Sequence, residues 1–344
     1  MSGHGQADMP QDGQLPFDTS SYDRTGADWL DETLAERALL MQGPMGSALM
    51  SQPGGQDVPA AYWNLGDPQE VSRLHWLYRA AGADLMLTNT FQANESALAR
   101  DEIADTVERV NNAAVSCAKR AGAPCVLGSM GSNGIFWLKE DSEEYRRARA
   151  AYRRQAYALL ASGAHGIMLE TFTALRDLET AIAGTSDVAD GMPVLVSFAI
   201  GDEGNLLGDG LNVEAACMRA QELGAYSVGI NCCSIEAATQ AVPRMTRATD
   251  LPVSVRPNAG YPHRGEDGSL TWHEDPQAFA RACEQWRADG ARIVGSCCGA
   301  GVLTTCTLAG VLDIERRDVR DARIRLVDLL NADCIGSGWV SSRC

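Results

Sequence analysis

Three cysteines are the residues best suited to chemistry in this chain of 344 residues. Cys232 directly follows one short apolar run, residues 226–231, and the adjacent pair Cys297 and Cys298 directly follows another, residues 291–296. Both runs indicate buried strands that end on sulfur. If the two strands lie in one parallel sheet, three thiolates can converge on a soft divalent metal and leave a fourth position for a substrate. This pattern favours a catalytic zinc over a structural one.

The other cysteines lack such a pattern. Cys233 directly follows Cys232, so its side chain would point the other way if the strand continued, and we expect it not to be a ligand. We expect the rest to be small core residues or to lie in the tail: Cys117, Cys125, Cys217, Cys283, Cys306, Cys334 and Cys344. A disulfide between Cys297 and Cys298 is a weaker alternative, because adjacent cysteines bridge only through a strained ring.

The elements that must position these sulfurs repeat along the chain. From about residue 38, short apolar runs alternate with longer amphipathic stretches, which is typical of βα units. We expect strands at residues 38–42, 84–88, 124–129, 165–169, 193–199, 226–231, 252–257 and 291–296. We expect helices at residues 69–82, 101–121, 142–163, 173–185, 212–223, 235–248, 275–289 and 303–330. Eight such units predict an α/β fold, a (β/α)8 barrel of the TIM type.

Short segments, most of them rich in glycine or amide side chains, end or follow most of the expected strands, at residues 42–47, 88–94, 128–134, 170–172, 229–232, 256–260 and 295–299. In a barrel these segments surround one active site at the C-terminal ends of the strands. An open, doubly wound sheet is the alternative, but it would gather its site at a single switch point. The distribution of the segments therefore favours the barrel.

Composition restricts the partners and the compartment. The formal net charge is -16 and the sequence pI is about 4.7, so we expect no nucleic acid as a partner. No apolar run approaches the roughly 18 residues of a membrane span, and the N-terminus lacks the pattern of a signal peptide. Eleven cysteines without an export signal indicate reduced thiols, and hence a cytoplasmic protein without membrane partners.

The chain divides into three expected parts. Residues 1–28 are rich in Gly, Gln, Asp, Ser and Pro, which predicts a disordered lead-in. Residues 29–330 hold the expected barrel, and residues 331–344 form a C-terminal tail. A hydrophobic content of 45% is ample for one large core.

Seven strand-end motifs, in this order, resemble those of the homocysteine S-methyltransferase family. They are Gly-Pro-Met-Gly-Ser (43–47), Thr-Asn-Thr-Phe (88–91), Gly-Ser-Met-Gly (128–131), Glu-Thr-Phe (170–172), Gly-Ile-Asn-Cys (229–232), Pro-Asn-Ala-Gly (257–260) and Gly-Ser-Cys-Cys-Gly (295–299). The similarity spans about residues 38–315. The second and sixth motifs are most similar to the homocysteine-binding module of cobalamin-dependent methionine synthase.

The resemblance implies an enzyme that methylates homocysteine to methionine, with Zn²⁺ bound by Cys232, Cys297 and Cys298 and the substrate thiol as fourth ligand. A free thiol has a pKa of about 8.5, so coordination to zinc would deprotonate it at neutral pH. No general base is then required. The two histidines near expected strands, His165 and His263, are accordingly expected to be structural or exposed to solvent.

The resemblance also implies a cradle for an amino acid. Glu170 matches a family carboxylate that holds the substrate ammonium, although capping of the following helix is an alternative. Backbone amides from Gly43 onward and the side chains of Asn89 and Asn258 could complete the cradle. Gln42 stands where the family usually has Asp, which removes a charge-assisted hydrogen bond of about 1.5–3 kcal/mol. Gln42 could therefore select a different thiol.

The methyl donor stays open at this stage. S-methylmethionine, a betaine-like cation and a separate methylated corrinoid protein are the candidates, because we expect no folate or cobalamin domain within these 344 residues. Aromatic residues that could cage a cation, or simply pack under loops, are Phe91, Phe136, Trp137, Phe172 and Tyr261. Two other functions remain. One is a methyltransferase of the same fold that uses another thiol or exchanges methyl groups with a separate corrinoid protein, and the other is a catalytically inactive zinc-binding barrel.

Overall fold

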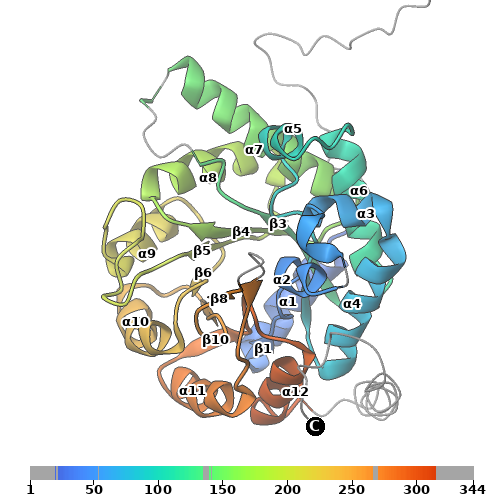
Figure 1. Ribbon diagram of the computed structural model, residues 1–344. Coiled ribbons are helices and arrows are strands. Elements are labelled where there is room, and N and C mark those ends of the chain that lie inside the picture. The colour runs from blue at the N-terminus through green and yellow to red at the C-terminus, as the bar shows by residue number, and fades with distance from the viewer. Residues whose placement is uncertain are drawn as a thin grey trace, which may run out of the picture.

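Eight parallel strands form a ring that the helices surround (Figure 1). The computed structural model describes residues 20, 22–52, 54–134, 139–140, 142–265 and 270–314. The strands of the ring are β1 (Leu39–Leu40), β2 (Leu85–Leu87), β3 (Cys125–Met130), β4 (Ile167–Phe172), β5 (Val194–Phe198), β6 (Val228–Asn231), β7 (Val253–Arg256) and β10 (Ala291–Val294). Their hydrogen-bonded order is β1-β10-β7-β6-β5-β4-β3-β2, and a parallel bridge between Met41 and Leu85 brings β1 to β2. The predicted (β/α)8 barrel is confirmed.

The helices follow the strands in alternation. They are α1 (Thr25–Glu36), α2 (Gly46–Met50), α3 (Trp63–Gly66), α4 (Pro68–Ala81), α5 (Glu95–Arg100), α6 (Val107–Lys119), α7 (Glu143–Ala161), α8 (Leu175–Ala189), α9 (Val213–Glu222), α10 (Ile235–Ala248), α11 (Pro276–Ala288) and α12 (Val302–Val311). Several begin at a side-chain cap, as Ser142 does for α7 and Ser234 for α10. Such caps satisfy backbone N–H groups that the first turn leaves unpaired.

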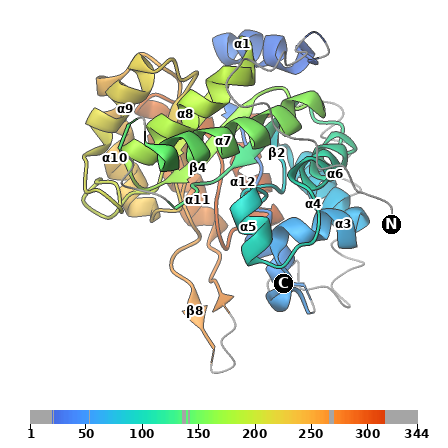
Figure 2. The ribbon, with the colours of Figure 1, turned by 90° about the horizontal axis from the view of Figure 1, so that it is seen from above.

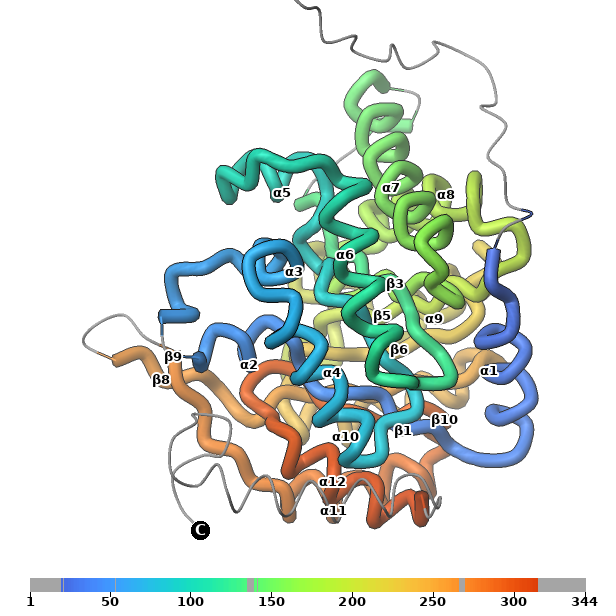
Figure 3. Tube along the Cα trace, turned by 90° about the vertical axis from the view of Figure 1, so that its right-hand side faces the viewer, coloured from blue at the N-terminus to red at the C-terminus, as the bar shows by residue number. Residues whose placement is uncertain are grey.

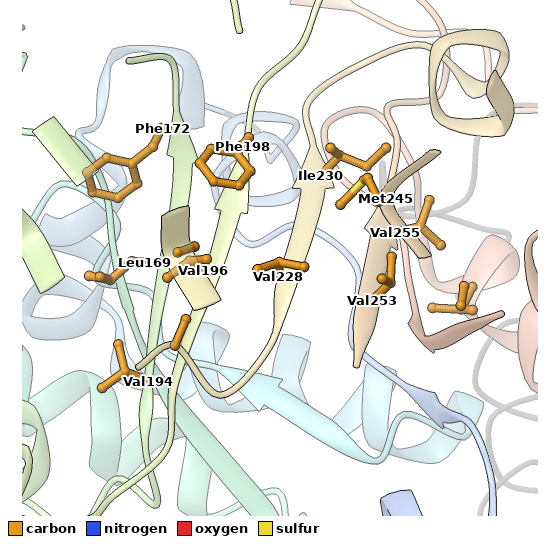
Figure 4. Close-up of a cluster of buried hydrophobic side chains, with 14 of the residues drawn as sticks. Leu169, Phe172, Val194, Val196, Phe198, Val228, Ile230, Met245, Val253 and Val255 are labelled. Carbon is orange, nitrogen blue, oxygen red and sulfur yellow. The ribbon is translucent and has the colours of Figure 1, made fainter. Parts of the chain in front are cut away.

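The strands are buried on both faces, as parallel strands of a barrel must be. Figure 4 shows side chains of β4 to β7 that form a hydrophobic cluster with Met245 of α10, including Leu169, Val196, Ile230 and Val255. Alternate residues of the ring belong to a separate cluster, which contains Leu39, Met41, Leu85, Leu87, Cys125, Leu127, Met168, Leu195 and Ile293. Since neighbouring side chains of a strand point to opposite faces, the second cluster fills the interior of the barrel.

Helix α1 closes the N-terminal end of the barrel. Its side chains Leu30 and Leu34 belong to the interior cluster. A short hairpin, β8 (His263–Arg264) paired with β9 (Leu270–Thr271), projects at the opposite end from α1 (Figures 2 and 3). The C-terminal ends of the strands are therefore the end at which a ligand can enter.

The boundaries differ from the sequence-based expectations in a few places. Helix α1 begins at Thr25, inside the stretch assigned to the lead-in, and Tyr22 just before it is anchored by a hydrogen bond from its hydroxyl to Val188 O at 3.0 Å. The last expected helix corresponds to α12, which ends at Val311, and the C-terminal tail lies outside the described residues. Within the described part of the chain, no helix has both the length and the apolar character needed to cross a bilayer.

Candidate functional site

A cavity of about 210 Å³ opens at the C-terminal ends of the strands. Residues that end or follow β1, β2, β3, β4, β6, β7 and β10 line it, together with Ala60 and Ala61. Its position is the one that a TIM-type barrel uses for catalysis, because loops from many strands converge there. The size suits a small molecule.

The three cysteines predicted to act together meet in this cavity. Cys232 follows β6, and Cys297 and Cys298 follow β10. The three Sγ atoms lie within 4.8 Å of one another, and those of Cys232 and Cys297 are 3.0 Å apart. All three thiols are free, and the 3.0 Å separation is longer than the roughly 2.05 Å of a disulfide. We call these residues the sulfur cluster.

The sulfur cluster fits a tetrahedral soft metal. Zinc bound to thiolates at about 2.3 Å places neighbouring sulfurs about 3.8 Å apart, so small side-chain movements would bring all three to bonding distance. Cys297 is buried, whereas Cys232 and Cys298 are partly exposed and all three line the cavity. Three protein sulfurs facing an open cavity could hold a metal ion and leave a coordination position for a substrate.

Asn231 is a residue of this site that the sequence analysis did not single out. Its fully buried Nδ2 lies 3.4 Å from Cys232 Sγ and 3.8 Å from Cys297 Sγ, and its Oδ1 accepts a hydrogen bond from Ser197 Oγ at 2.6 Å. The amide therefore donates toward two sulfurs of the cluster while the barrel holds its other end. In the sequence, its position directly before the predicted ligand Cys232 was the signal that could have identified it.

Two residues at the strand ends have left-handed backbone conformations. Cys232 has φ of 56° and Thr171, after Glu170, has φ of 63°. Non-glycine residues adopt this region at a cost and cluster at functional sites, where surrounding contacts enforce it. Here the turn redirects the Cys232 side chain from the line of β6 toward the cavity.

The sulfurs also influence each other's ionisation. Hydrogen bonds from Cys232 and Cys298 lower the pKa of Cys297 well below its ordinary value, and the positive charge of Arg256 acts in the same direction. Hydrogen bonding to Cys297 is also the main reason why the pKa of Cys232 is raised. Among the three thiols, the hydrogen bonds thus favour the deprotonated form of Cys297 over that of Cys232.

Glu170 lies in the cavity wall, as expected, but it is paired. Its Oε2 accepts a hydrogen bond from Arg256 Nη2 at 2.6 Å, and its Oε1 accepts one from Ser129 Oγ. Both members of the ion pair are buried, with 8% of Glu170 and 2% of Arg256 exposed. The sequence analysis passed over Arg256, although a charged residue that ends an otherwise apolar strand was a visible signal.

Gln42 also lines the cavity, and its amide is bound to the protein itself. Nε2 donates to Leu87 O at 3.0 Å, and Oε1 lies 3.0 Å from Nδ1 of the fully buried His75. Burial lowers the pKa of His75 to about 3, so the ring is neutral and donates its Nδ1 proton to Gln42. An amide suits both contacts, because its NH2 group donates and its carbonyl oxygen accepts.

Of the remaining residues of the expected cradle, two line the cavity and one does not. Gly43 lines the cavity. A Cβ at this position would lie 2.6 Å from Tyr78 Cε1, so the aromatic ring of Tyr78 leaves room only for glycine. Asn89 lines it as well, while its Nδ2 donates to Ala60 O at 2.6 Å. Asn258 is not among the lining residues, and its backbone N donates to Cys233 O at 2.8 Å.

The aromatic candidates for a cation cage are dispersed. Phe91 lines the cavity and is 36% exposed, whereas Phe172 is fully buried in the core. Tyr261 is 70% exposed beyond β7, and Phe136 and Trp137 lie outside the described residues. Of the described candidates, Phe91 is therefore the one placed to contact a ligand.

The histidines and the other cysteines lie elsewhere. His165 Nδ1 accepts a hydrogen bond from Val126 N at 2.9 Å, and His263 is exposed on β8. Cys233 belongs to the main hydrophobic cluster and not to the sulfur cluster. Cys117, Cys125, Cys217 and Cys283 are buried and Cys306 is partly exposed; Cys334 and Cys344 lie outside the described residues.

The chain is similar to proteins of known activity over most of its length. The sequence profile of the family described as homocysteine S-methyltransferase matches residues 39–309. The methionine synthase of Mycobacterium leprae is 31% identical over 288 residues, which cover 78% of this chain and 24% of that protein. The homocysteine S-methyltransferase of Escherichia coli is 28% identical over 288 residues, which cover 76% of this chain and 90% of that protein. The chain therefore spans about a quarter of the length of the mycobacterial methionine synthase.

Solved structures show the same fold. The metallated form of the homocysteine methyltransferase MmuM from Escherichia coli matches with a TM-score of 0.67 at 22% sequence identity. The match covers 82% of this chain and 99% of that one. This likeness concerns the barrel alone, and it extends over almost the whole of the compared structure.

Proposed function

The chain belongs to the homocysteine S-methyltransferase family, and we propose that it methylates the thiol of homocysteine to give methionine, with zinc held by Cys232, Cys297 and Cys298. The observation that carries the proposal is the meeting of three free cysteine sulfurs, from β6 and β10, in a cavity at the C-terminal end of the barrel. Zinc bound there would supply the Lewis acidity that keeps a thiol deprotonated at neutral pH.

The residues around the sulfur cluster support this role. Asn231 donates toward Cys232 and Cys297 and so limits the orientations of both side chains. Glu170 supplies a carboxylate in the cavity wall, which suits the ammonium group of an amino-acid acceptor. The free state of the described cysteines agrees with a reducing compartment, which supports a location in the cytoplasm.

The methyl donor can be identified by testing the candidates one at a time. Zinc-loaded protein would be incubated with homocysteine and, separately, with S-methylmethionine, betaine or a methylated corrinoid protein, and methionine would be measured by mass spectrometry. We expect methionine from at least one donor. Zinc-loaded protein that forms no methionine with any of the three would contradict the proposed function and favour another thiol or a barrel without catalysis.

A further inference from the structure

Arg256 is a buried charge with unused hydrogen-bond donors. It ends β7 and is 2% exposed, and its Nη2 donates to Glu170. Its Nε is buried and has no hydrogen-bond partner among the described residues. A guanidinium carries five N–H donors and no acceptor, so one contact with a carboxylate leaves most of them unused. Buried donors of this kind favour an anionic oxygen as their partner.

Arg256 is one of the residues that line the cavity with the sulfur cluster. Arg256, Glu170 and Cys297 all line it, and Arg256 and Glu170 are the basic and the acidic residue of the lining. Ser296, which also lines the cavity, has a buried Oγ without a partner among the described residues. The wall next to the sulfurs thus presents a positive and a negative group side by side.

This charge pattern matches one class of acceptor. An α-amino acid carries an ammonium and a carboxylate on the same carbon, so the two groups can meet Glu170 and Arg256 together. A dianionic ligand such as a phosphate would instead face the carboxylate of Glu170 and the sulfurs, which repel it. An uncharged thiol would leave the Arg256 donors without an acceptor.

We propose that Arg256 binds the carboxylate of the acceptor and thereby restricts the enzyme to thiols that carry one. This assignment rests on the proposed function and adds the group that selects the acceptor. Glu170 and Arg256 then act as a two-charge clamp, in which each residue also holds the other in place. The backbone amides after Gly43 are the competing site for the carboxylate.

The test compares three thiols on zinc-loaded, full-length protein by isothermal titration calorimetry. The thiols are homocysteine, 3-mercaptopropylamine, which lacks the carboxylate, and 4-mercaptobutyrate, which lacks the ammonium. For the wild type we expect loss of the carboxylate to weaken binding at least about tenfold, as for a charge-assisted bidentate contact. For Arg256→Gln we expect homocysteine to lose about the same factor, while 3-mercaptopropylamine changes by less than about threefold.

The controls separate recognition from folding. Arg264→Gln removes an exposed arginine of β8 and should leave all three dissociation constants unchanged. If the wild-type protein binds homocysteine and 3-mercaptopropylamine equally well, this result alone would overturn the assignment. An equal loss for both ligands in Arg256→Gln would also overturn it, because it would show a structural role. If none of the three thiols binds, the proposed function itself is contradicted, and the assignment fails with it.

Discussion

The Asn231 side chain binds Thr171 through both of its polar atoms: Oδ1 accepts from Thr171 N at 3.0 Å, and Nδ2 donates to Thr171 Oγ1 at 2.7 Å. Thr171 directly follows Glu170, and Asn231 directly precedes Cys232. The contact therefore joins the end of β4, which carries the carboxylate, to the end of β6, which carries a sulfur. It also stabilises the left-handed conformations of Thr171 and Cys232.

The first prediction concerns Asn231→Asp. This change keeps the shape of the side chain but removes the N–H groups directed at two sulfurs and adds a negative charge beside them. We expect zinc affinity to fall by about 10-fold to 100-fold, the usual effect of losing a partner of the metal ligands. Competition with a chromogenic chelator measures this. Asn112→Asp, at an exposed position on α6, is the matched control and should bind zinc like the wild type.

The second prediction concerns Gly299, which follows the cysteine pair. It has φ of 81°, and a Cβ there would lie 2.1 Å from Trp272 Cγ. Gly299→Ala should therefore lower the free energy of unfolding by about 1–3 kcal/mol. Thermal unfolding tests this against Gly310→Ala in α12, where a Cβ would meet nothing within 4 Å. The second change should stabilise the protein by up to about 1 kcal/mol, and equal melting temperatures for both variants would contradict the argument.

The third prediction follows from His75. Its pKa falls from 6.5 to about 3 on folding because the ring is buried, so the native state excludes a proton that the unfolded chain binds. The contribution of the neutral His75 ring to the free energy of unfolding is fully present above pH 6.5. It is lost as the pH falls toward 3, and the free energy of unfolding then decreases by at most roughly 1.4 kcal/mol per pH unit. Denaturant unfolding of His75→Gln should therefore show a shallower decline between these values. His263→Gln, on exposed β8, should keep the wild-type slope; a wild-type slope in His75→Gln would refute the prediction.

Much of the fold could be predicted from the chain because its apolar runs are short and regularly spaced. Each of the eight expected strands overlaps a strand of the barrel, from Leu39–Leu40 to Ala291–Val294. Hydrophobic periodicity could not predict the β8–β9 hairpin, whose strands have two residues each and are partly or fully exposed. It also missed α1, whose apolar residues Leu30 and Leu34 are spaced for a helix but follow a polar lead-in.

The sequence could predict which residues lie at the strand ends, but not which side chains pair with one another across the site. The sulfurs meet because Cys232 and the pair at 297–298 follow parallel strands, which sequence spacing indicates. The pairs Glu170–Arg256 and Gln42–His75 join residues 86 and 33 positions apart, and spacing gives no information on such contacts. Gln42 illustrates the difference: the sequence shows an amide in place of a carboxylate, whereas the structure shows that this amide binds His75 and Leu87.

The most direct test of the central claim is the zinc content of purified Cys232→Ala and Cys233→Ala, measured by elemental analysis together with methionine formation from homocysteine. The two cysteines are neighbours in sequence, but only Cys232 belongs to the sulfur cluster, while Cys233 packs in the hydrophobic core. We predict that the wild type and Cys233→Ala bind about one zinc per chain and that Cys232→Ala loses both the zinc and the activity. Equal zinc content and activity in the two variants would contradict the account.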